Sequence, residues 1–133
     1  MKVLIVEDDF VARRVLQRLI SAYGEAEIAV SGEEAVAAHY ASLDEGEPYD
    51  LIFLDIMLPG IDGHEVLSRI RAHDEGAGKE RVRIIMTSSL RDAKNVMGAF
   101  KAQADAYLTK PFSSAGLTQA LVKAEVDLNG AAA

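Results

Sequence analysis

The chain has 133 residues, of which 50% are hydrophobic and 26% are charged, and these values are typical of one domain with a single main core. It contains no cysteine, which excludes disulfide scaffolds, zinc fingers and thiol catalysis. The 21 acidic and 14 basic residues give a net charge of −7, which argues against sequence-independent binding to nucleic acids or anionic membranes. We find neither a membrane-spanning apolar stretch nor a signal-peptide pattern, so we expect a cytoplasmic protein without membrane insertion.

Short aliphatic runs alternate with segments of helical periodicity along the chain. The runs at residues 2–6 and 51–54 lack alternating polar residues, which is typical of parallel strands covered on both faces. In chain order, the predicted elements are strand 2–6, helix 10–23, strand 26–30, helix 31–43, strand 51–54, helix 64–74, strand 82–86, helix 92–102, strand 104–108 and helix 113–128. This alternation predicts an α/β fold with a doubly wound, five-stranded parallel sheet. We expect one domain over residues 1–133, with its core at about residues 2–128.

Polar side chains follow four of the predicted strands at their carboxyl ends. Because parallel strands all end at the same edge of a sheet, we expect these side chains to meet there. They are Glu7, Asp8 and Asp9 after the first strand, Asp55 after the third, Thr87, Ser88 and Ser89 after the fourth, and Thr109, Lys110 and Pro111 after the fifth. Carboxylate, hydroxyl and cationic groups are therefore predicted to share one crevice.

The carboxylates at this edge require a cation among them. Two carboxylates about 4 Å apart repel by roughly 4 kcal/mol at an effective dielectric constant of about 20. Oxygen ligands suit a hard divalent ion, and the chain has no cysteine or strand-end histidine that would favour a softer metal. Mg²⁺ leaves coordination positions free for phosphate oxygens, to which Lys110 and Thr87 can supply a positive charge and a hydroxyl donor. These residues together predict phosphoryl transfer.

Each of these residues also has a simpler role when it is considered alone. Asp8 and Asp9 can cap the following helix, Thr87 can cap a loop, and Lys110 can be a solvated surface group. Asp55 can be a turn residue, although it follows four apolar residues and would be desolvated without a partner. Their joint position at the strand ends favours the functional interpretation.

Four blocks of sequence, residues 3–10, 51–63, 86–88 and 104–112, resemble the receiver domain of bacterial two-component response regulators. The blocks stand in the same order as in that family, and the resemblance spans essentially the whole chain. It implies a flavodoxin-like fold of five βα units with strand order 2-1-3-4-5. It also implies a cis peptide bond between Lys110 and Pro111.

The resemblance further implies which residues accept the phosphoryl group and bind the metal. Asp55 would be the phosphoacceptor. Asp8, Asp9, Asp55 and the backbone carbonyl of Met57 would hold Mg²⁺, for which Mn²⁺ can substitute. Asp9 and Asp55 would bind the metal directly, and Asp8 would bind it through water.

The resemblance also implies a conformational switch. Lys110 would pair with a phosphoryl oxygen, and Thr87 would donate its hydroxyl to another. Tyr107 would then move inward behind Thr87. This two-state change would alter a protein-binding surface.

We therefore expect a stand-alone receiver that acts as a signalling switch and not as a conventional enzyme. Its phosphodonor would be a histidine kinase or a histidine phosphotransfer protein. Its output would be binding to a downstream protein, as a monomer or a weak phosphorylation-dependent dimer, without direct contact to nucleic acid.

Two alternative functions stay open: a magnesium-dependent aspartyl-phosphate phosphatase and a receiver-like binding module that does not respond to phosphorylation. Such phosphatases usually carry a general-acid aspartate two residues after the nucleophile. Met57 occupies that position in this chain and cannot transfer a proton.

The first predicted helix carries three basic residues, Arg13, Arg14 and Arg18, on its polar side. We interpret them as a docking face for the phosphodonor. A solvated helix face explains them equally well.

Overall fold

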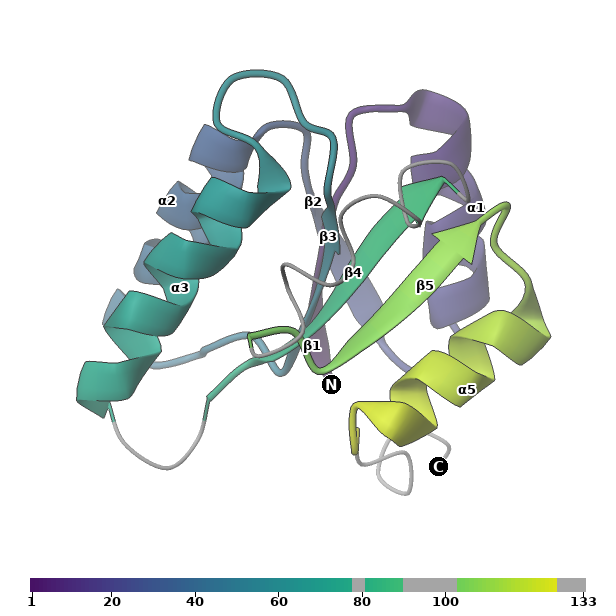
Figure 1. The fold of residues 1–133 in the computed structure, drawn as a ribbon. Coiled ribbons are helices and arrows are strands. Elements are labelled where there is room, and N and C mark those ends of the chain that lie inside the picture. The colour runs from purple at the N-terminus through teal and green to yellow at the C-terminus, as the bar shows by residue number, and fades with distance from the viewer. Residues whose placement is uncertain (78–80, 90–102, 127–133) are drawn as a thin grey trace.

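The computed structural model describes residues 1–77, 81–89 and 103–126 (Figure 1). In chain order its elements are β1 (Lys2–Val6), α1 (Phe10–Ile20), β2 (Glu25–Ala29), α2 (Gly32–Asp44), β3 (Leu51–Asp55), α3 (Gly63–Ala77), β4 (Arg83–Ser89), β5 (Ala106–Lys110) and α5 (Ser114–Lys123). The predicted helix over residues 92–102 lies outside the described residues. Within the described part of the chain, no helix combines the length and hydropathy needed to cross a bilayer.

The strands form one parallel sheet in the order β2-β1-β3-β4-β5. This confirms both the parallel sheet predicted from the alternation of elements and the strand order implied by the family resemblance. The direction of winding reverses between β1 and β3, which are neighbours in the sheet. In open α/β sheets, ligands bind outside the carboxyl ends of the strands at such a switch point.

Helices cover both faces of the sheet, so the fold has three layers (Figure 1). Alternate residues of each strand enter opposite cores. In β1, Leu4 and Val6 pack on the side of α2 and α3, whereas Val3 and Ile5 pack on the side of α1 and α5. Every residue of β3 is buried, which explains the uninterrupted apolar run that precedes Asp55.

Two strands extend further toward their carboxyl ends than the sequence predicts. β4 continues through Ser89 and β5 through Lys110, beyond the predicted ends at residues 86 and 108. Hydroxyl and cationic residues follow the apolar run in each case, but their backbones stay in the ladder, where Asp55 pairs with Thr87 and Ser89 with Lys110. Thr87 and Lys110 therefore lie within strands, still at the carboxyl edge of the sheet.

Helix boundaries also differ from the prediction. α1 ends at Ile20 instead of residue 23, and α3 continues to Ala77 instead of residue 74. α5 ends at Lys123 instead of residue 128. Its end is formed by Glu125, which has a φ of 58°, and by a hydrogen bond from the Val126 amide to the Leu121 carbonyl. A left-handed residue at this position is usually glycine, and the glutamate gives no sequence signal for the end of the helix.

Replacing Glu125 with glycine should stabilise the protein. A side chain in the left-handed region brings Cβ close to the following carbonyl, and glycine removes this clash, so Glu125→Gly should raise the free energy of unfolding by about 1 kcal/mol. Lys123→Gly is the matched control, because it places glycine inside the last helical turn and should lower that free energy by about 1 kcal/mol. Urea unfolding of both variants measures the difference, and a loss of stability in Glu125→Gly would contradict the explanation of the helix end.

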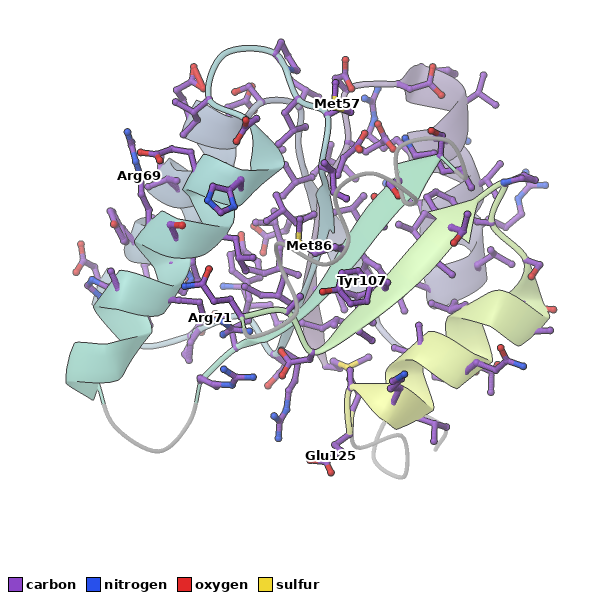
Figure 2. All side chains as sticks on the ribbon, viewed as in Figure 1. Met57, Arg69, Arg71, Met86, Tyr107 and Glu125 are labelled. Atoms are coloured by element: carbon purple, nitrogen blue, oxygen red, sulfur yellow. The ribbon has the colours of Figure 1, made fainter. Side chains whose placement is uncertain are left out.

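A buried ion pair closes the opposite, amino-terminal end of the sheet. The Arg71 guanidinium on α3 donates to an Asp105 carboxylate oxygen at 2.8 Å and to the backbone carbonyls of Gln103 at 2.8 Å and Val82 at 2.6 Å. The side chains of Arg71 and Asp105 are only 5% and 7% exposed. In Figure 2, Arg71 lies between α3 and the start of β4, far along the sheet from Met57.

Candidate functional site

Three carboxylates meet at the carboxyl edge of the sheet. Glu7 follows β1 directly and Asp55 is the last residue of β3, and both side chains are buried. Oxygen atoms of Glu7, Asp8 and Asp55 lie within 4.8 Å of one another. The predicted convergence of acidic residues from separate strands is therefore present.

Lys110 lies against two of these carboxylates. Its ammonium nitrogen is 2.6 Å from Glu7 Oε1 and 3.0 Å from Asp55 Oδ2. Burial lowers the pKa of Lys110, but the hydrogen bonds and charges of Glu7 and Asp55 outweigh it, so the pKa is raised and the side chain stays charged. Burial raises the pKa of Glu7, the adjacent Asp55 adds to the increase, and Lys110 partly opposes it.

Strand alternation explains why these side chains face one another. Phe53 of β3 and Leu108 of β5 both pack on the side of α1 and α5. Asp55 and Lys110 stand two residues further along the same strands, so they point to the same side. Glu7 continues β1 in the same way, because its amide still donates to the Ala29 carbonyl of β2 at 3.1 Å.

Asp9 lies outside this acidic cluster, which contains Glu7 in addition to the predicted Asp8 and Asp55. The Asp9 carboxylate accepts a hydrogen bond from the Ala12 amide at 2.9 Å and caps α1. Its own amide donates to Glu7 Oε2 at 3.2 Å. The acidic pair that faces Asp55 is therefore Glu7 and Asp8, one position earlier than the sequence predicts. Of the roles considered for Asp9, the structure shows helix capping.

Thr87 and Met57 lie beside Asp55. Thr87 is buried and pairs with Asp55 in the β3–β4 register, and its carbonyl accepts the Ile56 amide. The Met57 amide donates to Asp55 Oδ1 at 3.1 Å, while its side chain is 60% exposed. The structure thus brings both predicted residues to the cluster.

Tyr107 lies further from the edge and on the other face of the sheet. It pairs with Met86, one residue before Thr87 in β4, and packs against the core on the side of α2 and α3. Figure 2 shows it on β5, well below Met57. Burial raises the pKa of its hydroxyl. Because Thr87 follows Met86 in β4, strand alternation places Thr87 and Tyr107 on opposite faces of the sheet.

Arg13 is held against the backbone of the acidic segment. Its Nη1 donates to the Glu7 carbonyl at 3.0 Å and to the Asp8 carbonyl at 3.4 Å, and its guanidinium lies over the Phe10 ring. Arg14 and Arg18 are exposed. The three arginines therefore do not form one exposed face: Arg13 lies against the acidic segment, whereas Arg14 and Arg18 are exposed to solvent.

The donor set of the acidic cluster fits a hard divalent cation. Three carboxylates and one ammonium leave an excess of negative charge in a partly buried space. The clustered ligand atoms are all oxygens, without sulfur or imidazole nitrogen, and Mg²⁺ binds such groups while keeping several waters. The residues present therefore fit Mg²⁺.

Most of the chain matches one protein family. Residues 3–122 match the family described as the response regulator receiver domain. The chain belongs to this family. The chemotaxis protein CheY of Halobacterium salinarum is 36% identical over 121 residues, which cover 90% of this receiver domain and 92% of that protein. Other relatives are longer, and the chain spans only 46% and 42% of two bacterial regulatory proteins.

Two solved structures resemble this receiver domain closely. One is the receiver domain of the sensor histidine kinase PA1611 from Pseudomonas aeruginosa PAO1, with a magnesium ion in its active site cleft; it is 28% identical, has a TM-score of 0.75 and covers 93% of this chain and 97% of that one. The other is the receiver domain of Saccharomyces cerevisiae Ssk1 in a complex with the histidine phosphotransfer protein Ypd1. It is 25% identical, has a TM-score of 0.77 and covers 96% and 91% of the two chains.

Glu7 belongs to the acidic cluster, although the predicted set of metal ligands does not include it. A signal for it exists, because it stands two residues after Ile5 and so continues the alternation of β1 toward the same core. The alternation of buried residues in β1 predicts that Glu7 faces the site. A pair of adjacent aspartates predicts Asp8 and Asp9 instead.

Proposed function

We propose that this receiver domain accepts a phosphoryl group on Asp55 from a phosphohistidine and thereby changes its protein-binding surface. The observation that carries the proposal is the buried Asp55 carboxylate, which lies between further carboxylates and 3.0 Å from the Lys110 ammonium. A carboxylate in this position can act as a nucleophile, and a fixed cation beside it can receive an incoming anion.

The reaction transfers the phosphoryl group from nitrogen to oxygen. A carboxylate oxygen of Asp55 forms a bond to phosphorus while the bond from phosphorus to the donor imidazole breaks, and the imidazole keeps the electron pair. Lys110 pairs with a phosphoryl oxygen, and the Thr87 hydroxyl donates to another. When bound, Mg²⁺ supplies the positive charge that reduces repulsion between the carboxylate and the phosphoryl group. We assign its ligands to Asp8, Asp55 and the Met57 carbonyl, with Glu7 beside them.

The partner would be a histidine kinase or a histidine phosphotransfer protein. The likeness to the receiver domain of Ssk1, which was solved with a phosphotransfer protein, supports this class of donor. Arg14 and Arg18 on α1 are exposed on the same helix whose start is capped by Asp9, and we propose them as donor contacts. Arg13 is better explained as a support for the acidic segment. The stand-alone organisation and the downstream protein target stay predictions, as does the weak dimer.

Mg²⁺-dependent incorporation of phosphate from acetyl phosphate tests this function. The mass of the intact protein should rise by one phosphoryl group in the presence of Mg²⁺ and should not change when a chelator replaces the metal. Rapid and continued hydrolysis of a phosphomonoester would instead favour a phosphatase. Unchanged mass with Mg²⁺ present would favour a binding module that does not respond to phosphorylation.

Asp8→Asn and Asp9→Asn form a matched pair that tests the metal ligands. Asp8→Asn should weaken Mg²⁺ binding by at least about tenfold, since removing even an outer-shell partner costs about 10–100-fold in metal affinity. Asp9→Asn should bind Mg²⁺ as the wild type does, because asparagine caps a helix as well as aspartate. Calorimetric titration with Mg²⁺ measures both constants. A loss that is larger in Asp9→Asn would return Asp9 to the metal site and contradict the geometry.

A further inference from the structure

The loop between β3 and α3 is tied at its tip to the first turn of α2. The Ile61 amide donates a hydrogen bond to Glu33 Oε1 at 3.1 Å, across 28 positions in the sequence. In Figure 1 this loop arches beside the start of α2, above the carboxyl ends of the strands. The same loop contains Met57, whose carbonyl we assign to the metal site.

Two glycines allow this close approach. Gly60 has a φ of 73°, and a Cβ on it would lie 2.5 Å and 2.6 Å from the carboxylate oxygens of Glu33. A Cβ on Gly32, the residue before Glu33, would collide with the Ile61 carbonyl oxygen and would lie 2.8 Å from Val66. The Glu33 carboxylate therefore lies directly against the backbone of the loop tip, where no side chain separates them.

The two ends of the loop are fixed by other hydrogen bonds. The Met57 amide donates to Asp55 Oδ1 at 3.1 Å, and the Gly63 amide donates to the Ile56 carbonyl at 3.0 Å. Glu33 adds a third attachment at the tip, between these two. A backbone carbonyl binds a metal well only when the loop that carries it is held in place, and outer-shell hydrogen bonds provide this support.

We propose that Glu33 is a positioning residue for the Mg²⁺ site, which acts by holding the loop that carries the Met57 carbonyl. The inference rests on the proposed function, because it concerns the metal used in phosphoryl transfer. Glu33 is not a member of the acidic cluster that Glu7, Asp8 and Asp55 form in the described part of the chain, so its effect would pass through the loop.

Glu34 provides a matched control for Glu33. Both are exposed acidic residues in the first turn of α2, where a carboxylate interacts favourably with the helix dipole. The hydrogen bond of Glu34 to the helix cap uses its backbone: the Glu34 amide donates to the Ser31 hydroxyl at 3.2 Å. An alanine at this position retains that bond. Glu33→Ala and Glu34→Ala therefore share the change in charge but differ in the contact with the loop.

The experiment combines amide hydrogen exchange with calorimetric titration of Mg²⁺, both on the whole chain. In Glu33→Ala, the Ile61 amide should exchange about tenfold faster and the Mg²⁺ affinity should fall by about tenfold, at the lower end of outer-shell effects. In Glu34→Ala, both quantities should stay at the wild-type value. Glu33→Gln should restore both, because its amide oxygen can accept the same hydrogen bond.

Equal Mg²⁺ affinity in the wild type and Glu33→Ala would overturn the positioning role, even if Ile61 exchanged faster. Equal losses in Glu33→Ala and Glu34→Ala would also overturn it, because the effect would then belong to the charge of the helix turn. These results leave the proposed function intact. A wild-type protein that binds no Mg²⁺ would overturn the proposed function itself, and the positioning role with it.

Discussion

Asp55→Asn should abolish the incorporation of phosphate from acetyl phosphate while the protein stays folded. Asparagine has nearly the same shape as aspartate, but its amide is not a nucleophile toward phosphorus under these conditions. The remaining carboxylates, Glu7 and Asp8, differ from Asp55 in their surroundings, since only Asp55 combines burial at a strand end with contacts to both Lys110 and the Met57 amide. Mass spectrometry of the intact protein measures the loss.

Asp62→Asn is the control for this experiment. Asp62 lies in the same connection between β3 and α3, but its carboxylate accepts the Glu65 amide at 3.0 Å and caps α3. Asparagine retains this cap, so phosphate incorporation should equal that of the wild type. Full incorporation in Asp55→Asn would show that another residue is the acceptor and would refute the assignment.

Arg71→Met should destabilise the protein by about 3 kcal/mol, because removing one partner of a buried ion pair leaves the other buried charge only partly compensated. The substitution also removes the donors to the Gln103 and Val82 carbonyls. Arg81 still faces Asp105, which places the expected loss at the lower end of the usual range of about 3–5 kcal/mol. The measurement is the free energy of unfolding in urea.

Arg69→Met provides the comparison on the same helix. Arg69 pairs with Glu65 at 3.0 Å, but both side chains are 47% exposed, and Figure 2 shows Arg69 on the outer side of α3. An exposed pair of this spacing contributes only about 0.3–0.5 kcal/mol. Equal losses in the two variants would show that the burial of Arg71 and Asp105 does not determine their contribution. Phosphate incorporation should be unchanged in both, because the pair lies at the opposite end of the sheet from Asp55.

The sheet could be predicted because its signals are local and repeated. Apolar runs without polar alternation mark covered strands, and their regular alternation with helices requires a parallel sheet. From there, the meeting of Asp8, Asp55, Thr87 and Lys110 at one edge follows from topology alone. This prediction requires no knowledge of individual contacts.

The prediction and the structure differ at positions where one residue decides the outcome. The sequence does not mark where β1 stops: its ladder continues through the Glu7 amide, and the chain then turns so that Asp9 caps α1, which leaves Glu7 and not Asp9 in the acidic cluster. The predicted ends of β4 and β5 come too early for a related reason, since polar residues at the edge of the sheet can remain in the ladder. The end of α5 depends on the left-handed Glu125.

Two contacts between distant segments away from the strand ends have no signal in the sequence. The pairing of Arg71 with Asp105 and the contact of Glu33 with Ile61 join residues 34 and 28 positions apart. Arg71, Asp105 and Glu33 are ordinary charged residues when each is considered alone, and Ile61 contributes only its backbone amide. Only the packing of α3 on the sheet and of the loop on α2 gives these residues their partners.

The central claim is that Glu7, Asp8 and Asp55, from two separate strand ends, form a metal site at which Asp55 receives a phosphoryl group. A crystal structure with Mn²⁺ and beryllofluoride tests it most directly. We predict an anomalous peak for manganese between Asp8, Asp55 and the Met57 carbonyl, with beryllofluoride bonded to Asp55 and its fluorine atoms facing Lys110 and Thr87. Manganese bound at Asp9, or a site without metal and beryllofluoride under these conditions, would contradict it.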